Sequence, residues 1–277
     1  MFENTIRRMP RPQDVAGMTT QELRDTFHIA NPFAPGQLNG TFTDLDRMAV
    51  GGIMPLKPVE LPNPRETGRA FFLERRELGA INVGGPGAVR ADGKTFTLDR
   101  LDCVYLPMGT KSVVFESADA KNPAKFYFLS CPAHAAHPAA SMKMKDASPA
   151  PLGSQAAANK RTIYKYIHTG GIKSCQLVMG FTVLEEGSVW NSFPPHSHGR
   201  RTEIYFYFDL GENVLIHCFG EPQQTRHLFL HNEEIALSPG WSIHCGCGTA
   251  NYKFIWGMAG ENQTFDDMDG VKPVDLR

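Results

Sequence analysis

The feature of this sequence that most constrains its fold is a series of short apolar runs separated by turn-forming residues. The runs are five to eight residues long, are rich in β-branched and aromatic side chains, and end near glycine, proline, asparagine or aspartate. Such segments, recurring about every ten residues, are typical of an all-β sandwich or barrel. We therefore predict an all-β fold built from the runs at residues 79–85, 94–98, 112–117, 125–130, 203–210, 213–219, 226–231 and 252–258.

Few helices are expected, and the clearest candidate is short. Residues Thr19–His28 form an amphipathic pattern in which Thr19 or Thr20 can cap the helix and Glu22 lies in its first turn. A second departure from the β pattern is residues 140–161, which are rich in alanine, serine and proline and show little periodicity. This composition predicts a linker between two halves of the chain.

The two halves share an order of features that indicates an internal duplication. Each half contains a pair of arginines, then strand-like runs separated by a turn, then a proline segment. The distance from Arg76 to Pro107 is 31 residues, and the distance from Arg201 to Pro239 is 38 residues, a difference that a modest insertion explains. We therefore predict two related β-domains in tandem, at residues 1–139 and 162–277.

The charge balance and the N-terminal segment exclude several classes of partner. The chain carries 28 basic and 29 acidic side chains, so it has no long-range attraction for nucleic acid or an anionic membrane. No signal peptide and no run of about 18 apolar residues is present. We expect a cytoplasmic protein that binds neither nucleic acid nor membrane, with its six cysteines reduced. Cys245 and Cys247 lack a second cysteine pair, so they are expected to be structural or to line a pocket.

The strongest chemical signal is the segment PPHSHGRRTEIYFYF at residues 194–208. Alternate side chains of an extended strand face the same way, so His196 and His198 can both point into a barrel. Glu203 begins the next apolar run, and His244 lies 41 residues beyond it. Three imidazoles and one carboxylate suit Zn, Mn, Fe, Co or Ni, and they leave a position open for substrate or water.

This spacing resembles the two-part signature of the cupin superfamily. The resemblance implies two tandem cupin barrels, that is, double-stranded β-helix or jelly-roll domains, with the metal in the second. One departure is visible, because Gly240 directly follows Pro239, although the family glycine usually stands two residues after the proline; the usual downstream asparagine is also absent. In the first domain the matching positions, near Phe71–Leu73 and Ser112, carry no ligand set. The first domain is therefore expected to be structural, an oligomerisation platform or a lid.

A more specific resemblance extends from about Gly51 to the C-terminus. The chain is similar to the bacterial 5-keto-4-deoxyuronate isomerases of pectin degradation, also called 4-deoxy-L-threo-5-hexosulose-uronate ketol-isomerases. The similar segments are GGIMP (51–55), FFLERRELGAINVGG (71–85), PAKFYF (123–128), PPHSHGRRTEIYFYF (194–208), QQTRHLFLHNE (223–233), SPGWSIHCGCGT (238–249) and FIWGMAGENQTFDDMD (254–269).

The resemblance implies a zinc-dependent aldose–ketose isomerase. Its reaction would convert 5-dehydro-4-deoxy-D-glucuronate, a small uronate, to 3-deoxy-D-glycero-2,5-hexodiulosonate. It also implies a homo-oligomer, by family resemblance a hexamer, with one zinc ion per chain. The implied ligands of that ion are His196, His198, Glu203 and His244.

Moving a carbonyl from C1 to C2 requires a general base within reach of the C2 proton. Tyr205 and Tyr207 share a face with Glu203 by the period of two, and His227 and the Asp266-Asp267 pair are further candidates. These residue types leave the choice among them open.

The substrate carboxylate is matched best by an arginine guanidinium. Arg161, Arg201 and Arg226 are the candidates, and Arg201 and its neighbour Arg200 face opposite sides of an extended strand, so only one of the two is expected in the pocket. Trp256 is expected to contribute to an apolar pocket wall.

Two other functions remain open beside the isomerase. The same ligand set serves iron or manganese cupins that act as dioxygenases or decarboxylases. A non-catalytic sugar-binding bicupin is the other alternative. Oxygen uptake, release of CO2, or binding of a uronate without turnover would distinguish these alternatives from the isomerase.

Overall fold

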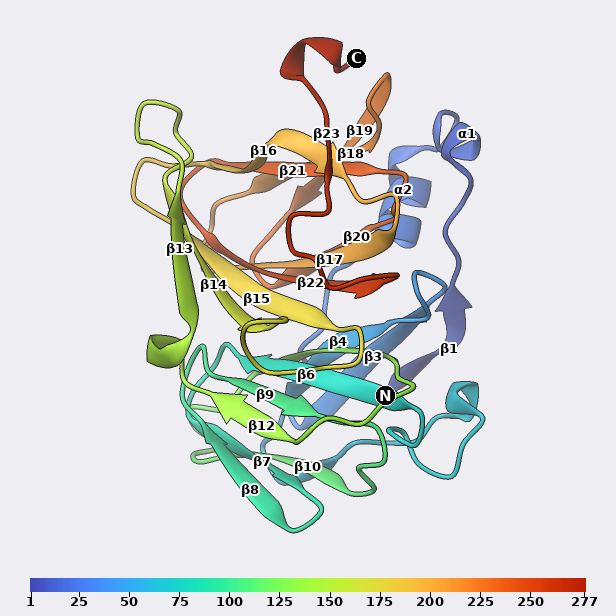
Figure 1. Ribbon diagram of the computed structural model, residues 1–277, viewed down its shortest axis with the longest axis vertical. Coiled ribbons are helices and arrows are strands. Elements are labelled where there is room, and N and C mark those ends of the chain that lie inside the picture. The colour runs from blue at the N-terminus through green and yellow to red at the C-terminus, as the bar shows by residue number, and fades with distance from the viewer. The chain divides into compact units, whose positions relative to one another are not determined.

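The computed structural model describes residues 1–277, apart from the side chain of Asn4 (Figure 1). These residues form two compact units, each assembled from separate stretches of the chain. The first unit, here unit 1, contains residues 1–7, 31–147 and 166–178. The second, here unit 2, contains residues 8–30, 148–165 and 179–277.

Unit 1 is built around two β-sheets. One has the strand order β1-β3-β4-β11-β6-β9-β12, and the other has the order β5-β10-β7-β8. The strands are β1 (Phe2–Arg7), β3 (Gln37–Thr43), β4 (Ala49–Met54), β5 (Val59–Glu60), β6 (Arg76–Asn82), β7 (Gly87–Ala91), β8 (Lys94–Leu98), β9 (Cys103–Leu106), β10 (Val113–Ser117), β11 (Phe126–Pro132) and β12 (Ala140–Met142). Short 3-10 helices lie at Arg65–Thr67 and Met144–Asp146. Phe72, Phe115, Phe126 and Phe128 are among the side chains of its apolar core.

Unit 2 also contains two sheets, with strand orders β13-β14-β15-β22-β17-β20-β2 and β19-β18-β21-β16-β23. Its helices are α1 (Pro12–Val15), α2 (Thr20–Phe27) and a 3-10 turn at Pro273–Asp275. Its strands are β2 (His28–Ile29), β13 (Ser148–Leu152), β14 (Arg161–Ile167), β15 (Val178–Leu184), β16 (Trp190–Ser197), β17 (Arg201–Phe208), β18 (Leu215–Glu221), β19 (Gln224–Leu230), β20 (Glu234–Ser238), β21 (Ile243–Gly248), β22 (Lys253–Gly260) and β23 (Asp269–Gly270).

The inner strands of the two larger sheets follow the same order, as the internal similarity in the sequence predicts, whereas the outermost strands differ because β1 pairs with β3 in parallel and β13 pairs with β14 antiparallel. β6 and β17 hold the same place between their neighbours, and each begins at the second arginine of an Arg-Arg pair, Arg76 in β6 and Arg201 in β17. Arg76 lies opposite the last residue of β11, and Arg201 lies opposite the last residue of β22. Leu78 therefore takes in unit 1 the position that Glu203 takes in unit 2.

The predicted helix near the N-terminus is confirmed. Thr19 is the N-cap of α2: its hydroxyl oxygen accepts a hydrogen bond from the Glu22 backbone N–H, and the Glu22 carboxylate accepts one from the Thr19 backbone N–H. This capping box satisfies two donors that the first turn of a helix otherwise leaves free. Leu23 and Phe27 form the buried face of the helix.

The predicted boundaries at residues 139 and 162 do not match the two units of the structure. Residues 8–30, which carry α1, α2 and β2, belong to unit 2, and His28 and Ile29 pair with β20. The segment 140–161 is not a linker, because it contributes β12 and β13 to the two larger sheets. β13 lies at the end of its sheet order, where proline is tolerated because one side of the strand needs no ladder hydrogen bonds.

β17 is the central element of unit 2 for the site described below. All eight of its residues are buried, since it pairs with β20 on one side and with β22 on the other. Its odd-numbered side chains from Glu203 to Tyr207 therefore project together from one face of the sheet. Among the residues described, no helix is long and apolar enough to cross a membrane.

Candidate metal centre and pocket

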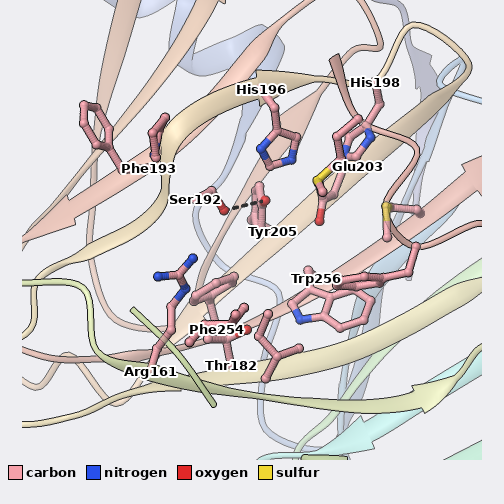
Figure 2. A pocket seen from close by; sticks show the side chains of 16 residues that line it. Arg161, Thr182, Ser192, Phe193, His196, His198, Glu203, Tyr205, Phe254 and Trp256 are labelled. Carbon is pink, nitrogen blue, oxygen red and sulfur yellow. Dashed lines mark hydrogen bonds and ion pairs between the residues drawn. The ribbon is translucent and has the colours of Figure 1, made fainter. Parts of the chain in front are cut away.

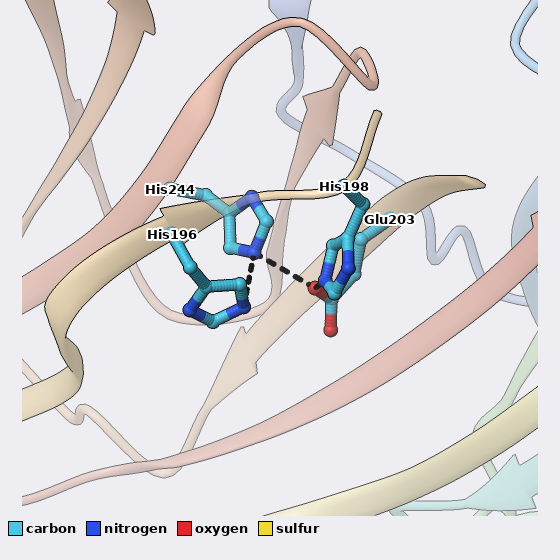
Figure 3. Close-up of side chains that lie close together, drawn as sticks. All are labelled: His196, His198, Glu203 and His244. Atoms are coloured by element: carbon cyan, nitrogen blue, oxygen red, sulfur yellow. Dashed lines mark hydrogen bonds and ion pairs between the residues drawn. The ribbon is translucent and has the colours of Figure 1, made fainter. Parts of the chain in front are cut away.

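Three elements of unit 2 bring the four predicted metal ligands together (Figure 3). His196 is in β16, Glu203 is in β17, His244 is in β21, and His198 follows the end of β16 directly. β16 and β21 are antiparallel neighbours, and His196 lies directly opposite His244. The four ligand atoms all lie within 4.8 Å of one another.

The spacing of these atoms fits a small divalent cation. The Nε2 atoms of His196 and His244 are 3.1 Å apart, and Glu203 Oε2 is 2.9 Å from His244 Nε2 and 3.0 Å from His198 Nε2. Metal–ligand bonds of about 2.0–2.1 Å in a tetrahedral zinc site place ligand atoms about 3.3 Å from one another. The donor set, three imidazoles and one carboxylate, suits a borderline transition metal.

Their surroundings hold His196 and Glu203 in the protonation states that a cation needs. Burial, together with the adjacent His244, lowers the pKa of His196 to about 3, so its imidazole is neutral at neutral pH. Burial would raise the pKa of the Glu203 carboxyl group, but His244 and His198 outweigh that effect and hold it well below its usual range. Glu203 is therefore an anion and His196 is neutral, which are the states in which these two side chains bind metal.

The four candidate ligands, here called the tetrad, lie beside a pocket of about 250 Å³ within unit 2 (Figure 2). His196, His198 and Glu203 line one part of it. The other polar lining residues are Arg161, Thr182, Ser192 and Tyr205. The rest of the wall is mostly apolar and contains Leu152, Ile163, Phe193, Pro194, Phe254, Trp256, Met258, Phe265 and Met268. An apolar pocket with a few convergent polar groups is the usual form of a site for a small molecule.

The structure separates three of the predicted acid–base candidates, Tyr205, Tyr207 and His227. Tyr205 lines the pocket, and its hydroxyl lies 3.2 Å from the Ser192 hydroxyl. Tyr207 is fully buried behind the pocket, where its hydroxyl lies 2.9 Å from His217 Nδ1. His227 is exposed on β19 and is not among the lining residues, so its position does not suit a general base for this pocket.

The predicted substrate-binding residues also separate. Arg161 and Trp256 line the pocket. Arg226 is absent from the lining, and its guanidinium donates a hydrogen bond of 2.6 Å to the Ala16 carbonyl oxygen, on the connection between α1 and α2. Arg201 is buried and is also absent from the lining, because its side chain turns toward the Asp267 carbonyl oxygen.

Several residues at this site had no signal in the sequence. Thr182 in β15 and Ser192 in β16 belong to no recognisable motif, and only the strand arrangement places them in the pocket. Phe265 and Met268 lie in the segment 254–269 that resembles the isomerase family, but nothing in the sequence marked them as pocket residues. Cys245 is buried and Cys247 is half-buried, and neither lines the pocket.

Comparison with known proteins identifies relatives over nearly the full length of the chain. The family model described as "KduI/IolB family" matches residues 30–271. A 4-deoxy-L-threo-5-hexosulose-uronate ketol-isomerase of Opitutus terrae is 52% identical over 97% of this chain and 98% of that protein. A protein of the same name from Halalkalibacterium halodurans is 48% identical over 96% of this chain and 97% of its own length.

Solved structures show the same fold at much lower sequence identity. An IolB-like protein of Salmonella typhimurium LT2 aligns with a TM-score of 0.73 at 13% identity, over 88% of this chain and 96% of that one. Oxalate decarboxylase of Lactobacillus farciminis aligns with a TM-score of 0.55 at 10% identity, over 78% of each chain. The shared architecture is the cupin fold, which confirms the predicted all-β class.

Proposed function

The chain belongs to the KduI/IolB family, and we propose that it is a metal-dependent ketol-isomerase acting on a small uronate. The relatives named as such isomerases support the general activity, and the proposed reaction is the one in their printed name. The proposed conversion is that of 5-dehydro-4-deoxy-D-glucuronate to 3-deoxy-D-glycero-2,5-hexodiulosonate. The observation that carries the proposal is the largely buried tetrad of His196, His198, Glu203 and His244, three of which line a mostly apolar pocket.

The tetrad would hold the metal, with zinc as the proposed ion and Mn, Fe, Co or Ni as ions that the same donors accept. A divalent ion held there supplies Lewis-acid stabilisation of the negative charge that develops when a proton leaves the carbon beside a carbonyl. His196 and Glu203 contribute ligand atoms that need no deprotonation at neutral pH, for the reasons given above. The aromatic and aliphatic side chains of the wall lower the local polarity and so strengthen the electrostatic interactions near the tetrad.

Tyr205 is proposed to act on a proton at a substrate oxygen. Burial raises the pKa of its phenol well above the usual value, and the Glu203 carboxylate adds to that effect. The phenol is therefore protonated at neutral pH and acts as a hydrogen-bond donor and proton donor rather than as a base. The Ser192 hydroxyl, 3.2 Å away, accepts from or donates to the phenol and orients it toward the pocket.

Arg161 is proposed to bind the substrate carboxylate. Figure 2 shows its guanidinium pointing from β14 into the pocket. Nη1 donates to the Asn159 carbonyl oxygen at 2.9 Å, which holds the side chain in place and leaves other N–H groups to serve a carboxylate. Burial lowers the pKa of Arg161, yet a guanidinium remains charged at neutral pH.

The remaining proposals follow from the family. We propose that the protein is cytoplasmic and works as a homo-oligomer, by resemblance a hexamer. Its substrate would come from the degradation of pectin oligosaccharides. No nucleic acid or membrane is a proposed partner, in keeping with the nearly neutral charge of the chain.

The test is to give the purified, zinc-loaded protein the unsaturated galacturonate product and to follow the C1 aldehyde by NMR. If the protein is the proposed isomerase, the aldehyde signal should disappear and a C2 ketone should appear, at a rate that falls after treatment with a chelator. Consumption of oxygen or release of CO2 would instead indicate a dioxygenase or decarboxylase. Tight binding of the uronate with a persistent aldehyde would indicate a sugar-binding protein.

A further inference from the structure

We propose that residues 262–269, here called the strap, position the metal ligand His198, and that the ion pair of Arg200 with Asp267 fastens the strap in place. The strap follows β22 and leads into β23, all within unit 2. This inference rests on the metal site of the proposed function. It assigns a role to the Arg-Arg pair and to the acidic segment near the C-terminus, which the reaction itself leaves unexplained.

The strap touches the metal site through a backbone carbonyl group. The Asp267 carbonyl oxygen lies 3.0 Å from His198 Nδ1 and also accepts a hydrogen bond of 2.8 Å from Arg201 Nη2. His198 Nδ1 also lies 3.3 Å from Arg201 Nη2; because a carbonyl oxygen can only accept, the shorter contact with the Asp267 carbonyl oxygen requires the proton on Nδ1. The lone pair of Nε2 then faces the tetrad, where Nε2 lies 3.0 Å from Glu203 Oε2. Hydrogen bonds of this kind fix the tautomer and orientation of metal-binding histidines.

The side chain of the same aspartate fastens the strap. Arg200 Nε lies 2.8 Å and 3.0 Å from the two Asp267 carboxylate oxygens, and Arg200 Nη2 lies 2.5 Å from Oδ1. Asn262 Nδ2 donates to Asp267 Oδ2 at 2.5 Å, and Arg200 Nη2 also reaches Asp269 Oδ1 at 3.2 Å. A guanidinium that engages both oxygens of a carboxylate fixes its direction as well as its distance.

The two arginines therefore contact the side chain and the backbone of the same residue, Asp267. Arg200 holds the Asp267 carboxylate, and Arg201 holds the Asp267 carbonyl group that meets His198. Arg201 is buried at the start of β17, whereas Arg200 lies in the turn just before it, so the two side chains reach different groups of the same aspartate. His198 lies in the same turn, since its carbonyl oxygen accepts the Arg201 backbone N–H at 3.1 Å.

The strap also forms part of the pocket wall. Phe265 and Met268 line the pocket, and the Phe265 ring lies 5.3 Å from the Trp256 ring. Lys165 Nζ lies 5.2 Å from the centre of the Phe265 ring. Release of the strap would thus disturb the orientation of His198 and the wall that faces the substrate at the same time.

The test uses the full-length protein after removal of metal, with Co²⁺ as the probe. The variants are Arg200→Gln, Asp267→Asn, their double variant, and the conservative Arg200→Lys. Lys253→Gln is the matched control, because Lys253 pairs with Asp209 at 2.5 Å in the same unit and neither residue lines the pocket. Circular dichroism and thermal unfolding of each variant show whether the fold is retained.

If the strap positions His198, Arg200→Gln and Asp267→Asn should each weaken Co²⁺ binding by about 10–100-fold, which is the usual cost of losing groups that orient a metal ligand. Their Co²⁺ visible absorption bands should shift, the double variant should be no weaker than the single ones, and Arg200→Lys should restore part of the affinity. The KM for the uronate should rise in the same variants at saturating metal.

Parent-like Co²⁺ affinity and absorption in the folded Arg200→Gln and Asp267→Asn variants would overturn the inference. An equal loss of Co²⁺ affinity in Lys253→Gln would also overturn the inference, because the loss would then not depend on the contacts of the strap. Failure of the proposed function is distinguishable from both results. If the variants change Co²⁺ binding as predicted but the parent leaves the uronate unchanged, the role of the strap stands and the isomerase proposal fails.

Discussion

His196 and His244 lie directly opposite each other on β16 and β21, and their Nε2 atoms are 3.1 Å apart. Their rings meet at an interplanar angle of 81° with centroids 4.5 Å apart. Two ring nitrogens that face each other at this distance leave room for at most one proton between them, and the ligand atoms of His198 and Glu203 lie close to the same point. A divalent cation bound there would accept a lone pair from each of the four side chains, so the cross-strand pair is central to the candidate metal site.

Replacing His198 with alanine should remove metal from the protein. The change deletes one of the four ligand atoms, so metal content after dialysis should fall well below one per chain. Added zinc stabilises the parent in proportion to the logarithm of its concentration over the dissociation constant, by about 2.7 kcal/mol at a hundredfold excess over that constant. The variant should lose most of this stabilisation in a thermal unfolding assay. His227→Ala, on the exposed face of β19, is the control and should keep both metal and stabilisation.

Replacing Arg161 with glutamine should weaken substrate binding more than it slows the chemical step. Hydrogen bonds to charged groups contribute about 1.5–3 kcal/mol, which corresponds to a rise in KM of about 10–150-fold. Arg161→Lys keeps a charge without the planar fork and should lie between the parent and Arg161→Gln. Steady-state kinetics with the uronate measures this effect. Arg226→Gln is the control, and a comparable rise in KM for that variant would contradict the placement of Arg226 away from the pocket.

Tyr205→Phe should lower kcat and leave metal content unchanged. Loss of a proton-transfer group commonly slows an enzyme by about 10²–10⁴-fold. Tyr207→Phe provides the contrast, because that hydroxyl bonds to His217 and does not line the pocket. For Tyr207→Phe we expect a loss of about 1 kcal/mol in the free energy of unfolding and little change in kcat. The reverse pattern in kinetics and urea unfolding would show that Tyr207 carries the chemistry instead.

The metal-free protein should lose stability in mild acid through His217. Burial, together with the nearby His244, lowers the pKa of His217 to about 3 in the folded chain. An unfolded histidine titrates near pH 6.5, so between about pH 6.5 and 3 the unfolded chain binds the extra proton. This contribution to the free energy of unfolding is fully present above pH 6.5 and is lost as the pH falls, by about 2 kcal/mol at pH 5.

His217→Gln removes the titrating group and should reduce the pH dependence by that amount. Urea unfolding of the parent and the variant near pH 7 and near pH 5, both with a chelator present, measures the difference. His196 titrates in the same direction and is common to both proteins, so it cancels in the comparison. An identical loss of stability in both proteins would show that His217 is protonated in the folded state.

The four residues that gather at the candidate metal site could be predicted from the sequence because much of their geometry is local. The alternation of a strand brings His196 and His198 to one side, and Glu203 lies near the start of the strand that follows the turn. His244 lies on a remote strand, and it was predicted from its spacing after Pro239, which resembles the cupin signature. The all-β class followed for a similar reason, since short apolar runs bounded by turn residues reflect local backbone preferences.

The domain boundaries and the pocket residues could not be predicted in this way. β2 is a two-residue strand that gains its stability from pairing with β20, more than 200 residues away, and nothing in its own sequence records that partner. Arg161, Arg201 and Arg226 were equal candidates as side-chain types. The structure separated them because their guanidinium groups meet a pocket, the Asp267 carbonyl oxygen and the Ala16 carbonyl oxygen respectively.

The sequence by itself determined the all-β class, the capped helix at Thr19 and the four residues that gather as a candidate metal-binding group, because each depends on neighbours within a few residues or on a recognisable spacing. Only the tertiary structure decided that Tyr205 and not His227 faces the pocket, and that the Arg200-Arg201 pair grips Asp267 rather than the substrate. The physical reason is that a side chain's role depends on which remote strand or loop packs against it. That choice is made by the burial and hydrogen bonding of the whole unit.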